Sequence, residues 1–269
     1  MKSPTPKSQR KLVLTHDVDW PLNGPGKAHV LARQDRFTPD IIQKMQEGNF
    51  NPYFGVPRIC EIEGKHGIRS TFFFRPIYDD GSPVMEYSET LRDLRAHGWE
   101  VGLHANNTAN QQDVDKEKSL IEQALGAPIV GCRIHCLKIQ ENTYPNFKAA
   151  SIKYDSSISY DKHTITPRNT GCFERDGVTV FPITYMDAYL FTYMKHTEES
   201  IVPYIVKTAK ELYEGGAELL TLLWHDNAVM MKGGRVYPKL VEELAALDIT
   251  FLTGSQAYQI VQEQKRETQ

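Results

Sequence analysis

The stretch Leu12-Val13-Leu14-Thr15-His16-Asp17-Val18-Asp19 contains the most informative pattern in this chain. Residues 12–15 predict a short buried strand, and Trp20-Pro21-Leu22-Asn23-Gly24 cannot continue it. Because the side chains of a strand alternate between its two faces, we expect Asp17 and Asp19 on one face and His16 on the other. The pattern therefore predicts two carboxylates side by side at a strand end.

Such a pair of carboxylates is unfavourable without a compensating interaction. Two neighbouring carboxylates repel each other unless one binds a cation or the two share a proton. Asp17 and Asp19 therefore indicate a general base beside a metal ligand. The alternative is a turn in which one aspartate caps a backbone amide.

The composition limits the class of protein. The chain has 269 residues, 40% of them hydrophobic, and a formal net charge of -3, so we expect no nucleic-acid partner. No apolar run reaches the roughly 18 residues of a membrane span. The N-terminus is basic, but no apolar stretch follows Met1, so we expect no secretion signal and a cytoplasmic protein. The four cysteines do not indicate a disulfide framework.

Strand-like and helix-like stretches alternate along the rest of the chain. The predicted strands are 12–15, 70–74, 99–103, 128–133, 153–155, 178–181, 219–224 and 249–252. The predicted helices are 56–66, 86–97, 111–125, 145–152, 197–213, 238–247 and 256–264. Repeated strand–helix units imply parallel strands with right-handed crossovers, which predicts an α/β barrel of about seven parallel strands. We expect one domain over residues 1–269 with its core at about 11–264, and surface or rim loops at 20–54 and 159–178.

Polar residues lie where the predicted strands end. In an α/β barrel these ends meet at one face, where active sites are found. Taken singly, His225 could be a core histidine, Arg133 a solvated ion-pair partner and Asp187 a helix N-cap. Together they predict a functional site. The residues at these ends are Asp17, Asp19, His104, Arg133, His135, Asp187 and His225.

These residues stand in motifs that resemble the polysaccharide deacetylase family, carbohydrate esterase family four. The motifs come in the family's order from about residue 12 to 252, and the ordered set carries the resemblance. It implies a distorted (β/α) barrel and a metal-dependent hydrolase that removes N- or O-acetyl groups from sugars. The motifs are Thr-His-Asp-Val-Asp, Ser70-Thr71-Phe72-Phe73, Glu100-Val101-Gly102-Leu103-His104, Arg133-Ile134-His135, Tyr154-Asp155-Ser156-Ser157 and Leu222-Leu223-Trp224-His225.

The resemblance also implies a role for most of these residues. Asp17 matches the family's catalytic base, and Asp19 and His104 match two of its metal ligands. Arg133 matches the arginine that orients the base, and His225 matches the general acid. Asp187 lies near the position of the acidic residue that orients that histidine.

Two positions depart from the family pattern. Thr108 stands where the family usually places a second metal histidine, four residues after the first. The pattern Arg-x-Pro-Tyr is replaced by Arg133-Ile134-His135-Cys136. Strand alternation puts His135 on the same side as Arg133, so we predict that His135 supplies the third ligand. The alternative is that His135 only lines the groove and binds substrate.

The resulting expectation is a divalent ion, zinc first, with cobalt, nickel, manganese or iron as alternatives. A backbone N–H near Cys136 would help to stabilise the oxyanion. The expected substrate is a carbohydrate, in a cytoplasmic protein a nucleotide- or lipid-linked sugar. Aromatic side chains on the rim could stack on the sugar. The alternatives are hydrolysis of another C–N amide bond and a catalytically silent sugar-binding barrel. The rim aromatics in question are Trp20, Tyr53, Tyr78, Tyr189 and Trp224.

Overall fold

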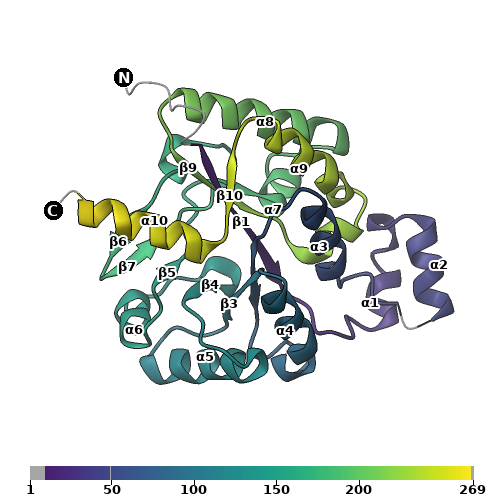
Figure 1. Cartoon of the computed structure of the whole chain (residues 1–269). Coiled ribbons are helices and arrows are strands. Elements are labelled where there is room, and N and C mark those ends of the chain that lie inside the picture. The colour runs from purple at the N-terminus through teal and green to yellow at the C-terminus, as the bar shows by residue number, and fades with distance from the viewer. Residues whose placement is uncertain (1–9, 49, 268–269) are drawn as a thin grey trace.

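A curled, mostly parallel sheet forms the centre of the computed structural model, which describes residues 10–48 and 50–267 (Figure 1). Its strands follow the order β6-β7-β5-β4-β3-β2-β1-β9-β8. The strand β10 lies off this path and pairs with the first residues of β1, whereas β2 pairs with the last residues of β1. Among the strands of the described residues, β6 and β7 are the one antiparallel pair. The strands are β1 (Lys11–Val18), β2 (Thr71–Phe74), β3 (Glu100–Ala105), β4 (Gly131–Ile134), β5 (Tyr154–Asp155), β6 (Phe173–Arg175), β7 (Val178–Val180), β8 (Tyr185–Met186), β9 (Leu219–Leu223) and β10 (Thr250–Leu252).

Helices surround the sheet and bury its outer face in one large apolar core (Figure 1). They are α1 (Lys27–Leu31), α2 (Pro39–Glu47), α3 (Val56–Lys65), α4 (Ser88–Ala96), α5 (Gln111–Leu125), α6 (Thr143–Ala149), α7 (Asp187–Thr192), α8 (Glu198–Glu214), α9 (Tyr237–Ala245) and α10 (Gly254–Glu267). No helix of the described part of the chain is long and apolar enough to cross a membrane.

The barrel is open between its edge strands, and a short segment after β7 bridges the opening. The N–H of Phe181 donates to Asp155 O (2.9 Å) and that of Ile183 to Ile158 O (2.7 Å). The N–H of Thr184 donates to Thr221 O on the opposite side (2.9 Å). The structure thus confirms the predicted distorted α/β barrel, with ten strands in place of about seven. The short strands β6 and β8 were not predicted, and neither was the antiparallel pairing of β6.

The interpretation of residues 20–54 as an irregular loop was wrong. This segment, called the inserted segment below, contains α1, α2 and the single turn Gln34–Arg36. It has its own small core, to which Val30, Phe37, Met45 and Tyr53 contribute buried side chains. Isoleucines and Met45 recur at helical spacing after Pro39, which stands in the first turn of α2. The basic residues 1–9, on which the absence of a secretion signal was predicted, lie outside the described residues.

The first strand is longer than predicted, because its polar residues have buried partners. On the outer face, the imidazole of His16 contacts Glu63 of α3 (Nε2 to Oε1, 2.8 Å) and the carbonyl of Trp224 (Nδ1 to O, 2.7 Å). Glu63 also accepts hydrogen bonds from Ser70, Trp99 and Tyr237. All five side chains are largely or fully buried, so this network fixes β1 against the helices and the end of β9.

Removal of the Glu63 carboxylate should therefore destabilise the fold. Glu63→Ala leaves four buried donors without their acceptor, and we expect a loss of about 3–5 kcal/mol in the free energy of unfolding. Urea denaturation followed by circular dichroism measures it. The matched control on the same helix is Glu61→Ala, which breaks only exposed ion pairs with Arg58 and Lys65 and should leave the midpoint almost unchanged. Equal midpoints for the two variants would contradict this role of Glu63.

Candidate active site

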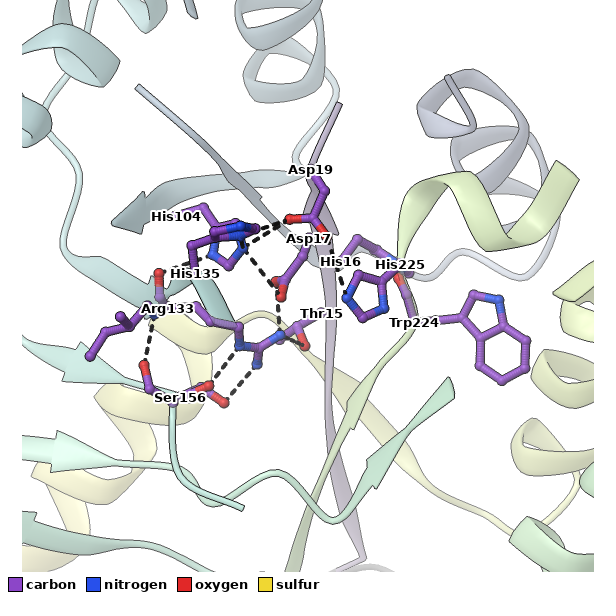
Figure 2. A network of polar contacts seen from close by, with 12 residues as sticks. Thr15, His16, Asp17, Asp19, His104, Arg133, His135, Ser156, Trp224 and His225 are labelled. Carbon is purple, nitrogen blue, oxygen red and sulfur yellow. Dashed lines mark hydrogen bonds and ion pairs between the residues drawn. The ribbon is translucent and has the colours of Figure 1, made fainter. Parts of the chain in front are cut away.

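All seven predicted site residues lie together at the carboxyl ends of the strands, and all of them except Asp187 are labelled in Figure 2. Asp17 lies on β1, His104 on β3 and Arg133 on β4. Asp19 and His225 follow the ends of β1 and β9, whereas His135 and Asp187 begin the short helical turns after β4 and β8. The parallel sheet brings these residues together, although up to 208 positions separate them in the sequence.

A buried ion pair joins Arg133 to Asp17. The guanidinium donates to Asp17 Oδ1 through Nη1 (3.0 Å) and to the hydroxyl of Thr15 (2.9 Å). Its other edge donates to the carbonyl (2.6 Å) and the hydroxyl (2.7 Å) of Ser156. Arg133 is fully buried, so its charge requires a carboxylate partner. This contact orients one oxygen of Asp17.

Asp19, His104 and His135 form a compact set of possible metal ligands. His104 Nε2 lies 3.1 Å from Asp19 Oδ1 and 3.2 Å from His135 Nδ1, and His135 Nδ1 lies 3.3 Å from the same carboxylate oxygen. Zinc bonds of about 2.0–2.1 Å at tetrahedral angles place two ligand atoms about 3.3 Å apart. The spacing of the three atoms therefore fits a zinc-like ion.

The hydrogen bonds around His104 also suit a metal ligand. Its Nδ1 lies 3.0 Å from the carbonyl oxygen of Arg133, which can only accept, so Nδ1 carries the proton. In the neutral imidazole this leaves the lone pair on Nε2, directed at Asp19 and His135. Burial alone would raise the pKa of Asp19, but the adjacent imidazoles hold that pKa well below its ordinary value, so the carboxylate is ionised.

Thr108 does not take part in this set. It is buried, and its hydroxyl hydrogen-bonds to that of Thr143 (2.8 Å). His135 comes instead from the turn after the neighbouring strand, where the next two residues, Cys136 and Leu137, both have positive φ. This backbone conformation is costly for residues other than glycine, and here it shapes the wall of the site.

His225, which is partly buried, and Asp187, which is buried, form a second hydrogen-bonded pair in the site. Nδ1 of His225 lies 2.6 Å from Asp187 Oδ1, and its backbone N–H donates to Oδ2 (3.0 Å). Nε2 points toward Asp19, at 3.7 Å from Oδ2. Burial acts to lower the pKa of His225, but the carboxylates of Asp187, Asp19 and Asp17 raise that pKa to about 10. The imidazole is therefore protonated at neutral pH, with Nε2 as the available donor.

Two adjoining clefts open onto these residues. The inner cleft, of about 240 Å³, is bounded by the ligand set and by a wall of Leu137, Met186, Tyr189 and Leu223. The outer cleft, of about 480 Å³, starts from Asp19, Ala188 and His225 and extends away from the other two ligands. Three basic residues on the clefts were not predicted from the sequence. Lys162 lines the inner cleft, and Arg36 and Lys232 line the outer one.

The predicted rim aromatics are mostly not available to a sugar. Tyr53, Tyr78 and Trp224 are buried in apolar clusters, so this expectation was wrong for them. Trp224 lies next to His225 but packs on the outer face against Phe191 and Tyr237. Trp20 packs on Tyr53 and His29. Of the five, Tyr189 alone lines either cleft.

Comparison with known proteins finds similarity in structure but not in sequence. No protein-family model and no curated protein matches this chain. A protein from Mycobacterium smegmatis described as a polysaccharide deacetylase shares 17% identity with a TM-score of 0.70, over 98% of this chain and 95% of its own. PuuE allantoinase shares 14% identity with a TM-score of 0.66, over 96% and 93% of the two chains.

A third solved structure adds a contrasting case. A pseudoenzyme of carbohydrate esterase family 4 from Bacillus anthracis shares 11% identity with a TM-score of 0.55, over 95% of this chain and 68% of its own. At these identities the likeness concerns the fold. This chain therefore has the fold of the polysaccharide deacetylases, as its motifs predicted.

The ligand set makes a prediction about metal affinity. His104→Ala and His135→Ala each remove one imidazole donor and should weaken zinc binding by a factor of about 100 or more. Thr108→Val is the control, because its hydroxyl faces Thr143, and it should bind zinc like the wild type. Competition with a fluorescent chelator measures all three. Native affinity in His135→Ala would contradict ligation by His135 and leave Asp19 and His104 as the protein ligands.

Proposed function

We propose that this chain is a metal-dependent hydrolase that removes an acetyl group from an acetylated sugar. The observation that carries the proposal is the arrangement of three groups around one cleft. A carboxylate fixed by a buried arginine and a histidine fixed by a buried carboxylate flank the three possible metal ligands. Attack by water on an amide needs a base, an electrophile and an acid in this relation.

Each of these residues has its own role in the proposed reaction. A divalent ion bound by Asp19, His104 and His135 would polarise the acetyl carbonyl and acidify a water molecule. Asp17 takes the proton from the attacking water, and Arg133 holds this carboxylate in position. His225 gives its Nε2 proton to the leaving nitrogen, while Asp187 holds the Nδ1 proton and the ring orientation.

The shape of the inner cleft supports a small acyl group. Its volume is about 240 Å³, and Leu137, Met186 and Leu223 give it an apolar wall. A methyl group fits against such a wall, whereas a sugar needs more polar partners. We further propose that the substrate is a nucleotide- or lipid-linked sugar in the cytoplasm.

A second candidate reaction is hydrolysis of a C–N amide bond other than that of an acetamide. The shared fold with the protein named PuuE allantoinase favours it, because the same base, ligands and acid serve any amide. Acetate release from a panel of acetylated sugars, with the zinc-loaded protein and with chelator-treated protein, separates the two reactions. We expect metal-dependent release of acetate. Turnover of cyclic amides without any acetate release would favour the second candidate.

The role of Asp17 can be separated from metal binding. Asp17→Asn keeps an oxygen for Arg133 but cannot accept a proton, so we expect kcat to fall by about 10²–10⁴ while zinc affinity stays within a few-fold of wild type. Asp19→Asn should lose zinc and activity together. Steady-state kinetics and metal analysis of both variants measure this. Equal loss of zinc in the two variants would contradict the division of roles.

The role of His225 can be tested through the leaving group. An amine must be protonated as it leaves, whereas 4-nitrophenolate leaves as an anion. His225→Ala should therefore lower kcat/KM on an acetamido sugar by about 10²–10⁴, and far less on 4-nitrophenyl acetate. Asp187→Asn should show the same selectivity with a smaller loss. An equal loss on both substrates would mean that His225 acts by another route, such as holding Asp19 in place.

A further inference from the structure

The outer cleft carries two cations that the proposed reaction does not use. Arg36 comes from the single turn in the inserted segment, and Lys232 comes from the loop that follows β9. The backbone N–H of Lys232 donates to the carbonyl of Arg36 (2.8 Å), which holds the two segments together at the cleft. In the same loop, Gly234 has no room for a side chain, because a Cβ would lie 1.8 Å from Ala228 O. Close backbone packing therefore fixes the wall that carries Lys232.

Arg36 and Lys232 are both exposed, and neither forms an ion pair with a carboxylate of the described residues. Within residues 10–48 and 50–267, no carboxylate oxygen lies within 4.0 Å of the Arg36 or the Lys232 side-chain nitrogens, although Asp35 neighbours Arg36 in sequence. The carboxylates that line the outer cleft are Asp19 and Asp187, and both are engaged by histidines. Apart from the Asp19 carboxylate, which the proposed metal ion would bind, the charges along this cleft that have no ion-pair partner in the described residues are positive. Such a cleft attracts an anion.

The position of His225 indicates which part of the substrate would lie near Arg36 and Lys232. His225 protonates the leaving nitrogen in the proposed reaction, so the sugar that carries this nitrogen lies on the side of His225. His225 lines both clefts, but only the inner one contains His104, His135 and an apolar wall, which suits the acetyl group. The outer cleft begins at His225, and its volume of about 480 Å³ has room for a sugar with a substituent.

We propose that Arg36 and Lys232 bind a phosphate group on the leaving sugar, so that the substrate is an acetylated glycosyl phosphate. This inference rests on the proposed deacetylase function and names its substrate class. A guanidinium and an ammonium from two fixed segments suit the several oxygens and the charge of a phosphate. The phosphate could belong to a sugar monophosphate or to a diester such as a nucleotide sugar, and both present the same oxygens to the two cations.

Binding to the inactive, zinc-loaded Asp17→Asn protein tests the proposal without turnover. Calorimetry compares N-acetylglucosamine 1-phosphate and UDP-N-acetylglucosamine with neutral N-acetylglucosamine. We expect the phosphorylated ligands to bind at least 10-fold more tightly. Arg36→Gln and Lys232→Gln, each added to this background, should lower the ratio of charged to neutral affinity by about 10-fold, the effect of one charge-assisted hydrogen bond.

The control is Lys44→Gln, which removes one positive charge from α2 of the same inserted segment but lines neither cleft. It should leave the ratio as in the parent protein. Tighter binding of the monophosphate or of the nucleotide sugar identifies which kind of phosphate is preferred. Raising the salt concentration should weaken only the charged ligands.

Three outcomes would overturn the inference. They are equal affinity for charged and neutral sugars, no measurable binding of either, and a preference for phosphate that survives both glutamine substitutions. The last would mean that the phosphate binds the metal and not the cations. Acetate release from neutral acetylated sugars by the wild type, together with any of these outcomes, would leave the proposed function standing. Phosphate binding that depends on Arg36 and Lys232, without acetate release from any substrate, would remove the function and keep the anion site.

Discussion

The candidate site depends on one buried ion pair, between Arg133 and Asp17. A guanidinium without exposed surface needs a carboxylate, and Asp17 is the carboxylate within its reach. The remaining donors of Arg133 bond to Thr15 and Ser156, so β1, β4 and the chain after β5 are tied to one side chain. Thr15 in turn donates to Leu222 O on β9 (2.9 Å). The same contacts that hold the barrel together therefore hold the proposed base.

Strand geometry extends this arrangement to the metal ligands. His104 and Arg133 are register partners on β3 and β4, and the carbonyl of Arg133 fixes the ring of His104. Along β1, alternation sends Thr15 and Asp17 into the barrel and His16 outward to Glu63. His16 also bonds to the carbonyl of Trp224, the residue before His225. Figure 2 shows how Asp19, at the end of β1, reaches both the His104 side and the His225 side.

The sequence was sufficient to predict the alternating strands and helices, the distorted barrel and the residues that meet at its carboxyl end. The sequence did not predict features that depend on contacts between residues far apart in the chain. Residues 16–18 continue β1 because His16 and Asp17 have partners 47 and 116 positions away. The strands β6 and β8 are two or three residues long, too short to carry a pattern. Exposure could not be read from residue type, so Trp224 was expected on the rim although it packs in the core.

The cations of the outer cleft illustrate the same limit. Arg36 and Lys232 stand in stretches without strand or helix periodicity, and only the folded chain brings them to one cleft. The replacement of the usual second histidine by Thr108 was visible in the sequence, and His135 was predicted beside Asp19 and His104 from strand alternation. The structure brings these three residues together, but His135 lies in the turn after β4 and not on the strand itself.

The central claim is that Asp19, His104 and His135 hold a catalytic divalent ion. Anomalous diffraction at the zinc edge, from crystals of the zinc-loaded protein, tests it most directly. We predict one peak bound by Asp19 Oδ1, His104 Nε2 and His135 Nδ1, with the imidazole of His225 outside the ligand set. A peak bound without His135, a peak elsewhere in the chain or no peak at this position would contradict the claim.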